Sequence, residues 1–295
     1  MTSESAPAPV GFIGLGNMGA PIATRLLAWP GGLTVCDVRP EATAPFTEAG
    51  ARAASTPAEL AEHARVICVT VIDDAQVTEV LTGPQGILRT AVAGTVIAVH
   101  STISDQTAEK LAAVCAEHAV EFVDAPVSGG AGAAQRGSLA VMAGGSDAAL
   151  AAIREPFACF SDRLVHTGPV GTGTRMKLAR NLLHFVSFTA ATEAQRLAEA
   201  AGLDLSALGK IVRHSDAITG GAGSIMLRDT TAPIDPDDFW FPILGHVRNL
   251  GEKDLSLAAD LGDRLGVDLP LTRIALDNLA AGLGVARPAL TSENS

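Results

Sequence analysis

The sequence predicts an α/β protein, with a doubly wound parallel sheet followed by an all-helical C-terminal domain built on a long interdomain helix. In the first half of the 295-residue chain, short β-branched runs alternate with Ala-, Leu- and Glu-rich stretches. This alternation is typical of βαβ units, whose strands are apolar because helices cover both faces of the sheet. From Thr172 onward the segments are long, Ala/Leu-rich and periodic. The length fits two domains of roughly 150 residues each.

The expected strands share runs of apolar residues: Val10–Ile13, Leu33–Cys36, Val66–Val71, Thr95–Val99, Glu121–Val123, Leu139–Met142 and Leu164–Val165. The expected later helices share Ala/Leu periodicity: Thr174–Ala201, Ser206–His214, Arg248–Leu265 and Leu271–Ala281. A helix from near Thr172 to Gly202 would be ~45 Å long, enough to leave one domain and begin a second. We therefore expect a loose tail over 1–9, a sheet domain over 10–167 and a helical domain over 168–295.

Composition narrows the classes of function. With 47% apolar and 18% charged residues the chain is globular, and its net charge of −11 disfavours binding to nucleic acid or to anionic membranes. No apolar run approaches the ~20 residues of a membrane helix, and residues 1–9 do not resemble a secretory signal. The four scattered cysteines suggest neither zinc nor a disulfide framework, so a reducing cytoplasm fits best.

Two absences narrow the chemistry further. The chain has no tyrosine, which excludes a tyrosine as the proton donor of a dehydrogenase. The seven histidines form neither HxxxH nor HExxH, so we expect no metal site.

The first expected strand leads directly into a glycine motif, GLGNMG, which covers Gly14, Leu15, Gly16, Asn17, Met18 and Gly19. Its first glycine permits a tight turn, its second lets backbone approach a pyrophosphate, and its third lets helix and strand pack closely. The following helix directs its N-terminus at the anion. The motif therefore predicts a dinucleotide site, although glycines alone can also mark a merely tight turn.

Asp37 ends the second expected strand, where a carboxylate can accept hydrogen bonds from an adenosine ribose. Its charge favours NAD because it repels a 2′-phosphate. Arg39, two residues later, could instead attract that phosphate. We expect NAD, with NADP possible.

A second candidate loop follows the strand that ends near Asp124. Ser128, Gly129 and Gly130 offer one hydroxyl and backbone N–H groups that no side chain shields, a small nest suited to a carboxylate. In an open parallel sheet, ligands bind beyond the carboxyl ends of the strands. An ordinary strand-ending turn would look similar.

The long helix carries a third candidate group. Lys177 and Asn181 are four residues apart and share a helix face in the first turns, close to the expected domain junction. Lysine is rare in this chain, and a lysine at a cleft suggests a group chosen for its tunable pKa. A solvated helix lysine is the alternative. Lys253 lies in a KDLSLA segment, where it could be a further site residue or one half of a surface charge pair.

Together these blocks resemble the β-hydroxyacid dehydrogenase family, which includes 3-hydroxyisobutyrate dehydrogenase and tartronate semialdehyde reductase. The matching stretches are FIGLGNMGAP at 12–21, DAPVSGG at 124–130, the Gly168–Asn181 block and the lysine of KDL at 253–255. The likeness implies a Rossmann domain, a 6-phosphogluconate dehydrogenase-like helical domain, and reversible NAD(P)-dependent oxidation of a small 3-hydroxy acid to its semialdehyde or ketone.

The resemblance also implies roles for residues. Lys177 corresponds to the catalytic acid/base and Asn181 to its hydrogen-bonding neighbour. Ser128 to Gly130 correspond to the substrate-carboxylate cradle, and Lys253 to a further substrate contact. Thr102, Val71 and Ile72 fall where the family lines its cofactor.

Some positions depart from the family pattern. His100 stands where many members have Ser, Ile72 where many have Pro, and the phenylalanine spacing of 239–251 is unusual. Because that stretch is expected to line the substrate pocket, the substrate itself stays open.

Two other readings remain. An imine reductase has the same fold but usually carries Asp or Tyr at the position of Lys177, and a non-catalytic nucleotide sensor would be expected to lose the lysine. The apolar helical faces predict a homodimer or homotetramer.

Overall fold

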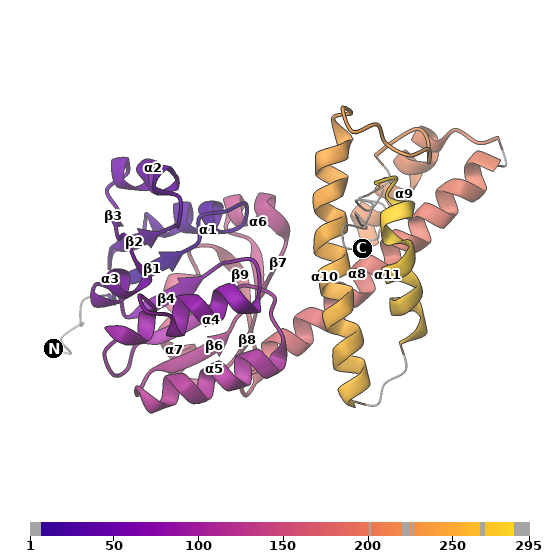
Figure 1. The fold of residues 1–295 in the computed structure, drawn as a ribbon. Coiled ribbons are helices and arrows are strands. Elements are labelled where there is room, and N and C mark those ends of the chain that lie inside the picture. Colours follow the sequence, from indigo (N-terminus) through magenta and orange to yellow (C-terminus); the bar gives the residue numbers. More distant parts are fainter. Residues whose placement is uncertain (1–6, 201, 220–224, 226, 266–268, 286–295) are drawn as a thin grey trace, which may run out of the picture. The chain divides into compact units, whose positions relative to one another are not determined.

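The computed structural model describes residues 7–200, 202–219, 225, 227–265 and 269–285. Contacts within the chain divide it into two compact units, Met1–Lys177 and Leu178–Ser295 (Figure 1). We call them the sheet unit and the helical unit. The division falls further along the long helix than the boundary expected at Gly168. Of the expected loose tail, residues 7–9 are described, and they contact the sheet unit: Trp29 Nε1 donates to the Ala8 carbonyl at 2.8 Å.

The sheet unit contains all the described strands: β1 (Val10–Ile13), β2 (Leu33–Cys36), β3 (Arg52–Ala53), β4 (Val66–Val69), β5 (Val96–Val99), β6 (Glu121–Asp124), β7 (Val127–Ser128), β8 (Leu139–Gly144) and β9 (Ser161–Gly168). Strands β3-β2-β1-β4-β5-β6 lie side by side and are all parallel. This order reverses direction between β1 and β4, as in a Rossmann fold, and such reversals place ligands at the carboxyl ends of the strands. The predicted fold class is confirmed.

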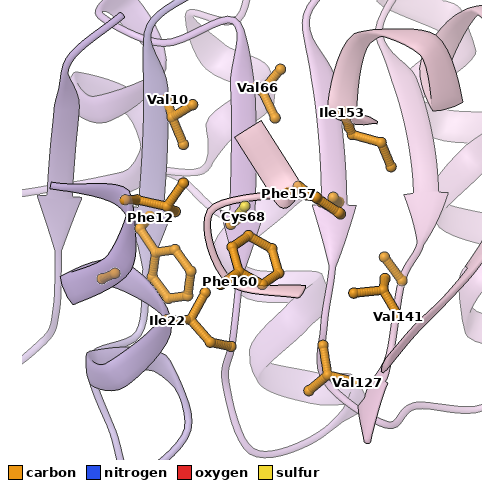
Figure 2. Close-up of a cluster of buried hydrophobic side chains, with 14 of the residues drawn as sticks. Val10, Phe12, Ile22, Val66, Cys68, Val127, Val141, Ile153, Phe157 and Phe160 are labelled. Atoms are coloured by element: carbon orange, nitrogen blue, oxygen red, sulfur yellow. The ribbon is translucent and has the colours of Figure 1, made fainter. Parts of the chain in front are cut away.

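Helices connect these strands and cover the sheet: α1 (Gly19–Leu26), α2 (Ala44–Glu48), α3 (Pro57–Glu62), α4 (Asp74–Thr82), α5 (Asp105–Glu117), α6 (Gly130–Arg136) and α7 (Asp147–Phe157), with short 3₁₀ turns at Pro40–Ala42 and Ile87–Arg89. Along β4 and β5, successive side chains enter opposite cores, as the two-residue period of a strand requires. Val66 and Cys68 join the cluster beneath α1, α6 and α7 (Figure 2), whereas Ile67 and Val69 join the one beneath α3, α4 and α5.

The far edge of the sheet differs from the sequence prediction, which expected parallel strands throughout. β8 pairs antiparallel with both β6 and β7, while β9 pairs parallel with β8. β6 and β7 therefore run in the same direction, and the chain reverses between Ser128 and Leu139, a stretch that contains the short helix α6, before β8 returns beside both strands. The two-residue strand β3 was also not predicted from the sequence.

The helical unit is built from most of α8 (Thr172–Ala200), which begins in the sheet unit, together with α9 (Leu205–Thr219), α10 (Trp240–Leu265) and α11 (Pro270–Gly282). Its core includes Phe185, Leu255 and Leu279. α10 begins earlier than the expected Arg248, because the Asp238 carboxylate accepts the Trp240 N–H at 2.8 Å and caps the helix. No helix in the described ranges is both long and apolar enough to cross a bilayer.

Candidate active site

The glycine loop after β1 has the geometry that its three glycines predict. Gly14 has a φ of +91°, and a Cβ there would collide with the Thr70 carbonyl oxygen. A Cβ on Gly19 would collide with the Gly14 carbonyl oxygen, so these two glycines close the turn and bring α1 against the sheet. Gly16 differs, because no atom lies within 4 Å of the position of its Cβ. The space beside Gly16 is therefore open for a ligand to approach the backbone.

The N-terminus of α1 provides donors beside this space. α1 begins after Met18 with no side-chain cap and no acidic residue in its first turn. By contrast, α4 is capped by the Asp73 carboxylate and α7 by the Ser146 hydroxyl. The first N–H groups of a helix need an acceptor, and a pyrophosphate can supply it. The loop and the helix start thus fit the dinucleotide that the motif predicts.

Asp37 follows β2 and binds the glycine loop directly. Its Oδ2 accepts the Leu15 N–H at 2.7 Å, and its Oδ1 accepts the backbone N–H and Nε of Arg39 at 2.9 and 3.0 Å. Partial burial raises the pKa of the Asp37 carboxyl, but the bonds from Arg39 and Leu15 outweigh it and leave the pKa below its usual value. The carboxylate therefore stays charged at neutral pH and ties β2 to the glycine loop.

The guanidinium of Arg39 contacts both oxygens of this carboxylate, from Nε to Oδ1 at 3.0 Å and from Nη2 to Oδ2 at 3.4 Å. The Arg39 side chain is 54% exposed, whereas that of Asp37 is 5% exposed. A ribose hydroxyl that bonds to Asp37 must compete with Arg39, since a carboxylate has about four acceptor positions. The structure thus brings together the residue that favours NAD and the residue that could accept a 2′-phosphate.

The loops after β4 and β5 hold the remaining residues expected to line the cofactor. The Ser101 hydroxyl accepts the Val71 N–H at 2.9 Å and donates to the Val71 carbonyl at 2.7 Å. The neighbouring Ile72 is 71% exposed, and Thr102 is half-buried beside Ser101. Ser101 was not singled out from the sequence, because its partner lies thirty positions earlier and only the pairing of β4 with β5 brings them together.

The expected carboxylate cradle lies at the start of α6. Gly129 and Gly130 have φ values of +133° and +70°, which residues with a side chain rarely adopt. No atom lies within 4 Å of a Cβ on Gly130, whereas a Cβ on Gly129 would approach the Ala133 Cβ at 2.6 Å. α6 has no side-chain cap, and Ser128 is half-buried. The open space at Gly130 would fit a small anion, and the binding of a carboxylate by this loop stays a prediction.

Lys177 lies on α8 shortly after its first turn, at the end of the sheet unit, and is half-buried. That first turn is bound to the sheet by Asp124, whose carboxylate accepts the N–H groups of Gly171 and Thr174. Burial raises the pKa of the Asp124 carboxyl to about 6. This contact was not predicted from the sequence, where Asp124 stood only as the first letter of the DAPVSGG motif.

The helical unit contains the other expected site residues. The buried Asn181 amide donates from Nδ2 to Asp254 Oδ2, and its Oδ1 accepts Arg180 Nη1 at 3.0 Å. Lys253 Nζ lies 3.3 Å from Asp254 Oδ1. Asn181 and Lys253, which are far apart in the sequence, therefore share one buried carboxylate. The hydrogen bond expected between Asn181 and Lys177 stays a prediction, as does the meeting of these residues with the sheet unit's loops. Among the described residues, no three His, Cys, Asp or Glu side chains cluster as metal ligands would.

Comparisons with known proteins bear on this arrangement. Residues 9–168 match the NAD binding domain of 6-phosphogluconate dehydrogenase, and residues 171–285 match the NAD-binding domain of NADP-dependent 3-hydroxyisobutyrate dehydrogenase. An uncharacterized oxidoreductase of Mycobacterium tuberculosis is 59% identical over 288 residues, which cover 98% of this chain and 97% of that protein. The mitochondrial 3-hydroxyisobutyrate dehydrogenase of Mus musculus is 36% identical over 88% of this chain and 77% of its own.

A solved structure of the same family is similar to this chain. The 3-hydroxyisobutyrate dehydrogenase of Mycobacterium tuberculosis, described with L-serine, is 29% identical, covers 93% of each chain and has a TM-score of 0.74. The fold and the glycine loop thus define an oxidoreductase that binds NAD or NADP. The chain belongs to the 3-hydroxyisobutyrate dehydrogenase family, one of the β-hydroxyacid dehydrogenases.

Proposed function

We propose that this oxidoreductase transfers hydride between NAD(P) and a small 3-hydroxy acid or its semialdehyde, with Lys177 as general acid/base. The observation that carries the proposal is the placement of Lys177, on the half-buried start of a helix whose first turn is bound to the sheet. The cradle at Ser128 to Gly130 follows the same strand, β6, that supplies this bond. L-serine, with which the structure of a family relative is described, is itself a 3-hydroxy acid, and this supports the substrate class.

In this hydride transfer, the cofactor, Lys177 and the cradle at Ser128 to Gly130 each have one role. NAD(P)⁺, when bound, supplies the hydride acceptor. As the substrate C–H bond breaks, Lys177 Nζ, as the neutral amine, takes the proton of the substrate hydroxyl, and in the reverse direction the ammonium returns it. General acid–base help of this kind contributes ~10²–10⁴ in rate. Ser128 and the N–H groups of Gly129 and Gly130 hold the substrate carboxylate and so orient the reacting carbon.

The helical unit contributes Lys253 and Asn181, which both contact Asp254. We propose that Lys253 contacts the substrate and that Asn181 supports Lys177. We prefer NAD to NADP because Asp37 keeps its negative charge where the ribose is expected. We also propose a cytoplasmic homodimer or homotetramer. Exposed apolar side chains on the helices of the helical unit, such as Leu183, Ile211 and Ile274, offer a surface to a second copy.

The test is a screen of purified protein against 3-hydroxy acids, short semialdehydes and imines, each with NAD(H) and NADP(H) separately. We expect turnover of a 3-hydroxy acid by the wild type, and loss of at least ~10²-fold in kcat for Lys177→Ala with cofactor affinity unchanged. Lys210→Ala, which removes a lysine from α9, is the matched control and should retain full turnover. Turnover of imines alone would indicate an imine reductase, and cofactor binding without any turnover would indicate a sensor.

A further inference from the structure

Asp124 is a buried carboxylate that the proposed proton transfer does not use. It is the last residue of β6 and has no exposed surface. Its Oδ1 accepts the Gly171 N–H at 2.8 Å and its Oδ2 accepts the Thr174 N–H at 2.6 Å. Both donors belong to the start of α8, so this single side chain binds two of the backbone groups that a helix leaves without an internal partner.

The same turn of α8 packs tightly against the strands. A Cβ on Gly173 would collide with the carbonyl oxygens of Met142 and Asp124, and a Cβ on Gly144 would approach Asp124 Oδ1 at 2.5 Å. The backbones of β6, β8 and α8 therefore pack closely around the Asp124 carboxylate. A tightly packed contact of this kind has little freedom to shift.

Two further carboxylates, both on α5, bind the start of α8 through Arg175. Arg175 Nε donates to the buried Asp105 at 2.8 Å, and Arg175 Nη2 donates to Glu109 at 2.6 Å. Asp105 and Glu109 lie in the first turns of α5. The start of α8 is thus bound both to the sheet and to a neighbouring helix.

We propose that Asp124 is the positioning residue for Lys177: its carboxylate fixes the first turn of α8 and thereby the place of the lysine with respect to the substrate cradle. This inference rests on the proposed function. Lys177 follows Thr174 by three residues, so the two side chains leave α8 about one helical turn apart and on the same side of the helix. Ser128, the first residue of the cradle, follows Asp124 by four residues. Asp124 thus binds the start of the catalytic helix and lies close in sequence to the cradle.

A carboxylate suits this position better than an amide. Two acceptor oxygens serve two N–H donors, and negative charge at a helix N-terminus is stabilised by the helix dipole. An asparagine would direct its NH₂ at one of the donors and leave that N–H buried without an acceptor. Protonation would likewise convert one oxygen to a donor. Burial raises the pKa of Asp124 to about 6, so this state is reached in mildly acidic solution.

Charged or titratable side chains lie on several elements packed around Asp124. On α8 it is Arg175, which is already bound to Asp105 and Glu109 of α5. After β5 it is His100, whose Nδ1 bonds the carbonyl of the adjacent Ala125, and burial lowers its pKa to about 4. On β8, Met142 and Gly144 carry no charge. On β9 it is His166, whose Nε2 lies 3.0 Å from the Gly145 carbonyl and 3.1 Å from the Gly168 carbonyl. We therefore expect the titration of Asp124 near pH 6 to persist in a His166→Gln variant.

The experiment compares Asp124→Asn with Asp162→Asn, a matched control that removes the same charge from an exposed position on β9. We expect Asp124→Asn to lower kcat by about 10 to 100-fold, to leave the cofactor Kd within about twofold, and to speed hydrogen exchange at the Gly171 and Thr174 amides. The control should change none of these. Faster exchange with kcat kept within about twofold of wild type would overturn the positioning role, as would unchanged exchange.

Two further measurements keep the inference testable. In the wild type, the amide proton shifts of Gly171 and Thr174 should titrate near pH 6 together with kcat, and this needs no variant that might fail to fold. A flat amide titration, or a kcat that does not follow it, would refute the inference. If the wild type turns over no 3-hydroxy acid, the proposed function fails instead. The exchange and titration data then still report whether Asp124 holds the turn.

Discussion

The substitution Gly16→Ala separates cofactor binding from folding. Gly16 is the one glycine of the GLGNMG loop whose Cβ position is open, with no atom within 4 Å. An added methyl group therefore fits the protein itself. Because alanine restricts the unfolded chain more than glycine does, the free energy of unfolding should stay equal or rise by up to ~1 kcal/mol.

The same methyl group should obstruct the ligand. A pyrophosphate that contacts the backbone of this loop would meet the new carbon at less than van der Waals distance. Overpacking of this kind costs about 1 to 3 kcal/mol. At ~1.4 kcal/mol per factor of ten, the Kd for NAD(H) or NADP(H) should rise about 5- to 150-fold. Stability and affinity are thus expected to change in different directions.

The assay pairs a cofactor titration by calorimetry with a urea unfolding curve on the same preparations. Gly245→Ala is the matched control, since Gly245 also has an open Cβ position but lies on α10, outside the sheet unit. It should leave the cofactor Kd unchanged. By contrast, Gly19→Ala should destabilise the protein, because its Cβ collides with a backbone carbonyl oxygen. A Gly16→Ala variant that binds cofactor like the wild type would show that the pyrophosphate does not approach this loop.

Three further outcomes are expected. Arg39→Ala should lower the affinity for NADP relative to NAD by about tenfold, because it uncovers the negative charge of Asp37; an unchanged ratio from paired titrations would contradict this. His100→Phe should alter the pH dependence of unfolding. The pKa of His100 is lowered in the folded protein, so the stability that it contributes is lost as pH falls from about 6.5 to about 4. The pKa of Asp124 is raised, so the stability that it contributes is lost as pH rises from about 4 to about 6. Each contribution is about 3 kcal/mol. Because the variant lacks the contribution of His100, it should lose less stability on acidification from pH 6.5 to pH 4 than the wild type does. Urea curves that shift equally with pH in both proteins would contradict this role of His100. Asp254→Ala should lower kcat/KM for the 3-hydroxy acid at least tenfold and leave the cofactor Kd unchanged, because it removes the shared partner of two site residues; wild-type kinetics would speak against that role.

Local patterns explain which parts of the fold could be predicted. The runs at Val10–Ile13 and Leu33–Cys36 coincide with β1 and β2, because strands buried on both faces must be apolar throughout. The start of α10 was placed too late, since Pro242 and Gly245 weaken the helical pattern although a proline in the first turn is tolerated. The antiparallel edge at β7 and β8 was missed because short apolar runs do not reveal the direction of pairing.

The sequence by itself determined the glycine loop, the alternation of strands and helices and the family, because each depends on residue type and spacing over a short stretch. Only the tertiary structure decided which distant groups meet. Asp124 binds Thr174 from fifty positions away, and Asn181 binds Asp254 from seventy-three. Such contacts leave no periodic trace in the chain, because a hydrogen bond between remote residues depends on how the elements pack and not on the residues between them.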